Sequence, residues 1–101
     1  MKTTIEELND RFLVTLEGEL DTVAAVEVNE RLQPLYQANG KNVDIDCKDL
    51  EYIASSGLRI LVSLVKGAKA GGSKVVLHHV NENIKDVFQM TGFTSLFEIE
   101  D

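Results

Sequence analysis

The stretch that decides the fold is YIASSGLRIL, residues 52–61. Within it, Ser55, Ser56 and Gly57 separate a strand-like segment from a long apolar run with helical spacing. Serine at the start of a helix usually caps it, because the hydroxyl satisfies a free backbone amide. The same free amides and the positive end of the helix dipole favour a negative group, so a serine there can carry a phosphate at little electrostatic cost. From these residues alone, a structural cap and a phosphorylation switch both stay open.

Helical patterns follow the serines. Apolar residues recur at helical spacing from Ser56 to Ala70 and stop at Gly71, which predicts a long and largely buried helix. A further helix is predicted between Asn81, a good N-cap residue, and Gly92, a typical helix stop. Both helices are followed by short apolar segments that suggest strands.

The first part of the chain suggests a hairpin and then a helix. Asn9-Asp10 is a plausible two-residue turn between two alternating segments. Asp21 is a candidate N-cap for a helix that begins at residue 22 or 23 and ends before Gly40. Pro34 removes a backbone donor inside that helix, so we expect a kink or a restart there.

The predicted element order is β-β-α-β-α-β-α-β. The strands are expected at residues 3–8, 11–17, 41–47, 75–77 and 96–99, with residues 48–54 as a link between the third strand and the serines. Strand-helix-strand units imply parallel neighbours, whereas the hairpin adds an antiparallel pair. We therefore predict an α/β fold with a mixed sheet. The length of the chain and its hydrophobic content of 44% match a single domain over residues 1–101.

Composition excludes several classes of function. The chain has 10 Lys and Arg against 17 Asp and Glu, a net charge of -7, which repels nucleic acids and anionic lipid surfaces. The longest apolar stretch, residues 58–65, is interrupted by Arg59 and Ser63 and is too short to span a membrane. Residues 1–7 lack the apolar region of a secretory signal. We expect a cytoplasmic protein with no direct nucleic-acid binding and no membrane insertion.

Other residues that could bind a metal or take part in catalysis have simpler structural explanations. Asp44 and Asp46 share the strand face opposite the core, as solvated charges usually do, so no metal site is predicted there. His78 and His79 point to opposite sides if residues 75–79 form a strand, and they are interpreted as structural or surface residues. Cys47 lies in an apolar alternation and is expected to act as a small hydrophobe.

Motifs for nucleotide binding and hydrolysis are missing. Gly71-Gly72 has neither the lysine and serine of a P-loop nor the further glycine of a dinucleotide fingerprint. The serines lack the flanking glycine pattern and a partner base that a serine hydrolase would need. We predict no cofactor, no catalytic residue and no enzyme activity.

Two segments resemble the signatures of the STAS domain family, the sulphate transporter and anti-sigma factor antagonist group. The first is GELD at residues 18–21, and the second is DLEYIASSGL at residues 49–58. Residues 87–93, VFQMTGF, are also similar to the end of the family's third helix. The order of elements agrees along essentially all of the chain.

The resemblance implies a partner-switching protein controlled by phosphorylation. In stand-alone members, the unphosphorylated domain binds and sequesters an anti-sigma factor that is also a serine kinase, which frees the sigma factor. Phosphorylation by that kinase ends the binding, and a serine phosphatase restores it. The expected function is that of an anti-sigma factor antagonist.

The resemblance also assigns roles to individual residues. Ser55 corresponds to the phosphoacceptor, with Ser56 and Gly57 shaping the start of the helix, and Asp21 should lie near the same surface. Together these four residues form the expected partner-binding site. The position before the phosphoacceptor is often Asp in the family, whereas here it is Ala54. Ser56 is the alternative modified residue, although a hydroxyl inside the first helical turn is less available.

Two other functions within the family stay open. The chain could be a non-phosphorylated STAS subunit of a membrane lipid-transport ATPase complex, or a STAS domain that binds a small ligand. Co-purification with a sigma-regulating kinase, with a transporter, or with a bound lipid or nucleotide would distinguish them.

Overall fold

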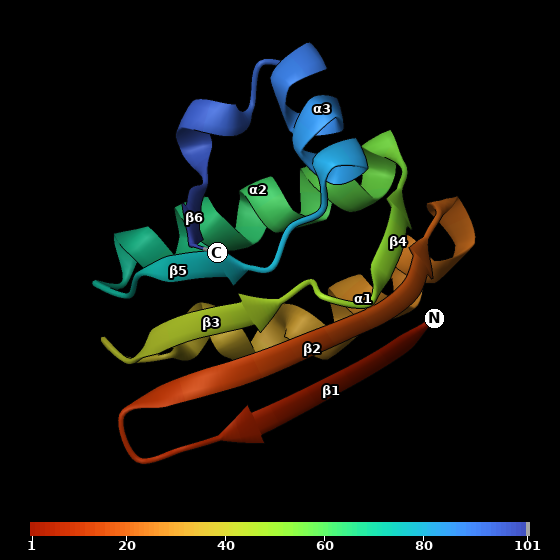
Figure 1. Cartoon of the computed structure of the whole chain (residues 1–101). Coiled ribbons are helices and arrows are strands. Elements are labelled where there is room, and N and C mark those ends of the chain that lie inside the picture. Colours follow the sequence, from red (N-terminus) through yellow and green to blue (C-terminus); the bar gives the residue numbers. More distant parts are fainter. Residues whose placement is uncertain (101) are drawn as a thin grey trace.

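A mixed sheet of six strands forms the centre of the molecule (Figure 1). The computed structural model describes residues 1–100. An antiparallel hairpin of β1 (Lys2–Glu7) and β2 (Arg11–Leu20) is continued in parallel by β3 (Asn42–Asp46), β5 (Val75–His78) and β6 (Glu98–Glu100). This arrangement confirms the predicted mixed sheet with an N-terminal hairpin.

The α-helices lie on one side of the sheet and at one end of it. α1 (Thr22–Leu32) and α2 (Ser55–Ala70) both lie behind the strands in Figure 1, whereas α3 (Glu82–Met90) packs near β4 (Leu50–Ile53). No helix among residues 1–100 covers the front of β2, β3 and β5 in this view. Within the same residues, no helix is long and apolar enough to cross a membrane.

Local sequence signals set the ends of the first elements. The amide of Leu8 donates a hydrogen bond of 2.8 Å to the carbonyl of Arg11, which closes the predicted two-residue turn. α1 ends at Leu32, and a 3-10 helix, Gln33–Gln37, begins with Pro34 in its first turn. The expected interruption at Pro34 is therefore confirmed, because proline fits the start of a helical segment but not its interior.

The core lies between the sheet and the pair α1 and α2. Side chains on the rear face of the strands meet the apolar stripes of both helices, and burying each large aliphatic side chain contributes about 1.5–3 kcal/mol before the entropy cost of ordering it. The fully buried members include Val14, Leu16, Leu20, Val28, Leu32, Val43, Ile45, Leu58, Leu61, Leu64 and Leu77.

The predicted link at residues 48–54 is wrong, because it contains β4. β2 continues three residues beyond its predicted end at Glu17, and this extension pairs in parallel with β4. Gly18 pairs with Leu50, but the next residue, Glu19, pairs with Tyr52. Glu51 is therefore an extra residue in β4, without a partner in β2. This bulge places Leu50 and Ile53 in the core at a spacing of three, so the strand lacks the alternation that would have revealed it. The observed order is β-β-α-β-β-α-β-α-β, with two short 3-10 helices.

The last strand begins two residues later than predicted. Residues 94–96 form a 3-10 helix, and β6 pairs with β5 only from Glu98 onward. Phe97 is instead buried against Phe88, with 4.7 Å between the ring centroids. Packing of this ring therefore determines where the strand can start.

Candidate functional site

Two helices begin side by side at one edge of the sheet. β2 and β4 run parallel and end at Leu20 and Ile53, and each is followed after one residue by a helix, α1 or α2. The amide of Ala54 donates a hydrogen bond of 2.9 Å to the carbonyl of Leu20. The hydroxyls of Ser56 and Thr22 lie 3.4 Å apart. These contacts bring the first turn of α2 next to the first turn of α1.

Asp21 caps α1, as predicted. Its backbone is extended, and its Oδ1 accepts a hydrogen bond of 2.8 Å from the amide of Ala24. The carboxylate also lies at the positive end of the helix dipole, which favours its negative charge.

Replacing Asp21 with alanine should lower the free energy of unfolding by about 1 kcal/mol, because the amide of Ala24 loses its acceptor. Urea denaturation followed by circular dichroism would measure this. Glu27→Ala is the matched control, since it removes an exposed carboxylate from the same helix without removing a cap. Equal losses in the two variants would contradict the capping role.

Neither serine caps α2, so the structural interpretation of Ser55 and Ser56 is wrong. The N-cap residue is Ala54, whose backbone is extended and whose side chain offers no acceptor. The helix starts at Ser55, one residue earlier than predicted, because the hydrogen bond from Ala54 to Leu20 fixes the turn there. The first bond of the helix runs from the amide of Leu58 to the carbonyl of Ala54, so the three amides before it lie outside the helical ladder.

The two serines differ in accessibility. Ser55 is exposed, and its hydroxyl makes no hydrogen bond with any residue among 1–100. Ser56 is half-buried and lies against Thr22. A protein kinase that approaches this edge of the sheet would therefore reach the hydroxyl of Ser55 more easily than that of Ser56.

Gly57 is buried where α2 crosses the end of β2. A Cβ atom at this position would lie 2.6 Å from Cγ and 3.0 Å from the carbonyl oxygen of Leu20, which is itself fully buried. The glycine therefore allows α2 to approach β2 closely. In this way it helps to position the two serines that precede it.

Two hollows lie along α1, a groove of mixed polarity and an acidic hollow. A groove of about 460 Å³ between α1 and α2 is lined by Val26, Ser56, Arg59 and Ile60, among others. On the far side of Asp21, a hollow of about 440 Å³ contains an acidic group of side chains. That hollow is lined by Met1, Gly18, Glu19, Asp21, Val23, Ala24, Glu27 and Glu51.

Two exposed valines of α1, Val26 in the groove and Val23 in the acidic hollow, were missed in the sequence. Val23 is 82% exposed and Val26 is 65% exposed, although both belong to α1. The sequence carries a signal for them, since both valines lie off the helix face that Ala25, Val28 and Leu32 bury in the core. Apolar residues off the core face of a helix are candidates for contact with a partner.

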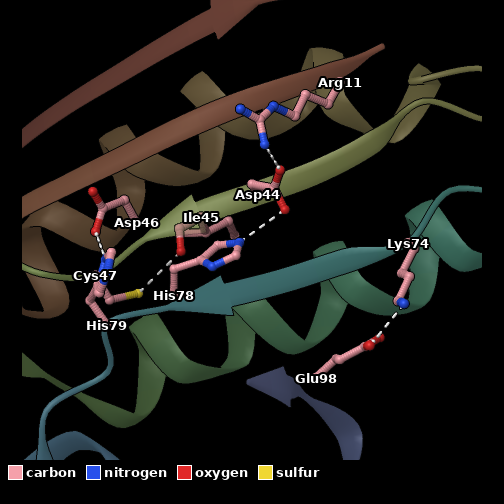
Figure 2. Close-up of polar contacts among 9 residues, drawn as sticks. All are labelled: Arg11, Asp44, Ile45, Asp46, Cys47, Lys74, His78, His79 and Glu98. Carbon is pink, nitrogen blue, oxygen red and sulfur yellow. Dashed lines mark hydrogen bonds and ion pairs between the residues drawn. The ribbon is translucent and has the colours of Figure 1, made fainter. Parts of the chain in front are cut away.

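A second polar cluster lies on the front of the sheet, and Figure 2 shows its contacts. Asp44 accepts one hydrogen bond of 3.0 Å from Arg11 and pairs with Nε2 of His78 at 3.0 Å. His79 Nδ1 lies 3.1 Å from Oδ1 of Asp46. Both histidines therefore face the same side of the sheet, contrary to the prediction. The reason is that the strand ends at His78, and His79 has a φ of 57°, which breaks the strand alternation.

Two groups in this region, the carboxyl of Asp46 and the thiol of Cys47, have shifted pKa values. Partial burial acts to raise the pKa of Asp46, but hydrogen bonds from the Lys48 amide and from His79 outweigh it and lower the pKa. Burial, together with the charge of Asp46, raises the pKa of the Cys47 thiol to about 12, so Cys47 is protonated at neutral pH and is a poor nucleophile. Among residues 1–100, no three His, Cys, Asp or Glu side chains converge closely enough to hold a metal ion.

Comparison with known proteins identifies related chains. The family model described as STAS domain matches residues 2–101. The anti-sigma-B factor antagonist of Bacillus subtilis is 31% identical over 86 residues, which cover 85% of this chain and 78% of that protein.

Solved structures show the same fold. The Bacillus cell fate determinant SpoIIAA in its phosphorylated form has a TM-score of 0.75 at 18% identity, over 99% of this chain and 92% of that one. An anti-sigma-factor antagonist (STAS) domain protein from Planctomyces limnophilus has a TM-score of 0.86 at 17% identity, over 98% and 88% of the two chains. These likenesses confirm the predicted α/β fold.

Proposed function

This chain belongs to the STAS domain family, and we propose that it is an anti-sigma factor antagonist that binds its anti-sigma factor only while Ser55 is unphosphorylated. The family resemblance that the sequence predicted is confirmed. The name of the Bacillus subtilis relative supports the function of an antagonist. STAS anti-sigma factor antagonists are non-enzymatic regulatory proteins, in agreement with the prediction that this chain is not an enzyme.

The observation that carries the proposal is the contrast between the two neighbouring helix starts. α1 has a carboxylate cap, Asp21, whereas α2 has none, and the exposed Ser55 is its first residue. A phosphate on Ser55 would lie beside amides that no side chain occupies, at the positive end of the α2 dipole. This supports Ser55 as a residue that can be modified without damage to the fold.

Ala54 contributes to this contrast. The Asp that often precedes the phosphoacceptor in the family would here be the N-cap residue, and its carboxylate could accept hydrogen bonds from the amides of α2. It would also repel a phosphate on the next residue. The alanine of this chain leaves the amides available and removes that repulsion.

The proposed partners are an anti-sigma factor with serine kinase activity and a serine phosphatase. The kinase transfers the γ-phosphoryl group of ATP to the hydroxyl oxygen of Ser55, and the hydroxyl proton is released. The phosphatase hydrolyses the phosphoserine and restores the hydroxyl. In this proposal the kinase interface extends from Ser55 to the groove lined by Ser56 and Val26, since a stable protein interface buries about 800 Å² on each partner.

The test is to phosphorylate the purified protein with its cognate anti-sigma factor kinase and to map the site by mass spectrometry. The wild type and Ser56→Ala should each gain one phosphate on Ser55, and Ser55→Ala should gain none. Since neither serine caps a helix, both alanine variants should fold. Modification of Ser56 alone, or of neither serine, would refute the proposal.

A further inference from the structure

Arg59 lies one helical turn after the proposed phosphoacceptor. It is exposed on α2 and lines the groove that also contains Ser56. Its guanidinium makes no ion pair or hydrogen bond with any residue among 1–100. Residues four apart on a helix are neighbours on its surface, so Arg59 and Ser55 share one face of α2.

The direction of the Arg59 side chain also favours contact with Ser55. Side chains on a helix point toward its N-terminus, so a long residue covers the turn that precedes it. For Arg59, that turn is the first turn of α2, which starts at Ser55. The five N–H donors of a guanidinium match the oxygen atoms of a phosphate.

We propose that Arg59 is a positioning residue that pairs with the phosphate on Ser55 and holds it against α2. The inference rests on the proposed function, in which Ser55 is the residue that carries the phosphate. An acidic group four residues before a basic one is the favourable order for such a pair on a helix. The pair keeps the phosphoserine in one place for recognition by the phosphatase.

The surrounding charges leave Arg59 available for this role. Among the residues that line the groove, Arg59 is the cation and Glu30 is the anion, and the two form no ion pair. Asp21 accepts a hydrogen bond from the amide of Ala24, and it lines the acidic hollow together with Glu19, Glu27 and Glu51, which adds negative charge near the start of α2. A dianionic phosphate on Ser55 would attract Arg59 more strongly than either single carboxylate.

The experiment uses protein in which phosphoserine is incorporated at position 55 during translation, so that no kinase is needed. The pH titration of the phosphate is followed by ³¹P NMR at low salt, where an exposed pair is least screened. Removing Arg59 destabilises the dianion, so Arg59→Gln should move the titration midpoint upward by about 0.3 in pH. Arg59→Lys keeps the charge and should keep most of the original midpoint.

The matched control is Lys66→Gln, which removes one exposed cation from the same helix further from Ser55. Its midpoint should stay at the wild-type value. An unchanged midpoint in Arg59→Gln, or the same upward shift in Lys66→Gln, would overturn the role of Arg59. Failure of the proposed function is seen separately, since it would appear as a lack of kinase modification at Ser55 while the titration result stands.

Discussion

Phosphorylation of Ser55 is expected to weaken binding to the anti-sigma factor about a hundredfold, or ~3 kcal/mol. A partner surface shaped for a small neutral hydroxyl would have to accommodate a bulky group with a charge of about -1.5 to -2. Like-charge or unpaired contacts in an interface cost several kcal/mol, so the loss needs no rearrangement of the fold.

Isothermal titration calorimetry with unmodified protein and with protein carrying phosphoserine at position 55 would measure the loss. Phosphoserine at position 95 is the matched control, because exposed Ser95 lies beside Val65 and Lys69 in the C-terminal half of α2, away from Ser55. The control should bind as the unmodified protein does. Equal weakening by both modifications would indicate a general effect of net charge and would contradict a specific switch at Ser55.

Gly57→Ala should lower the free energy of unfolding by about 2 kcal/mol, because the added methyl group overlaps with Leu20. Part of that contact is with the backbone carbonyl of Leu20, and the side chain of Leu20 is fully buried, so neither can move aside freely. The midpoint of thermal unfolding should fall by about 10 °C for a domain of this size.

Gly71→Ala is the control for Gly57→Ala. Gly71 lies at the end of the same helix with a φ of -90°, and a Cβ atom there would make only ordinary contacts, the nearest at 3.6 Å. Thermal melts of the two variants should therefore differ clearly. Stability of Gly57→Ala at the level of Gly71→Ala would show that α2 can shift away from β2 without cost.

Helix caps and hairpin turns were predictable because their signals are local. Asp21 and Asn81 each accept a hydrogen bond from an amide three residues later, Ala24 and Ile84, as their residue types and positions indicate. The turn at residues 9–10 also depends on a few neighbouring residues. Such features can be recognised without knowledge of the tertiary structure.

The missed features depend on contacts between distant segments. β4 pairs with residues 18–20 of β2, which extend beyond the part of β2 that pairs with β3. The bulge at Glu51 in β4 hides the alternation of buried and exposed residues that is typical of a strand. The exact start of α2 depends on the hydrogen bond between Ala54 and Leu20, residues that lie far apart in the sequence. A shift of one residue at this start changed the interpretation of Ser55 from a cap to the first helical residue.

The position of Met1 has a practical consequence for every binding experiment on this protein. Met1 lines the acidic hollow with Asp21, and its Cα atom would lie 3.6 Å from a Cβ atom at Gly18. An affinity tag or fluorophore attached to Met1 would therefore lie beside the proposed partner-binding surface. The turn between β1 and β2 lies at the opposite end of the hairpin (Figure 1), so a reporter inserted between Asn9 and Asp10 leaves that surface uncovered.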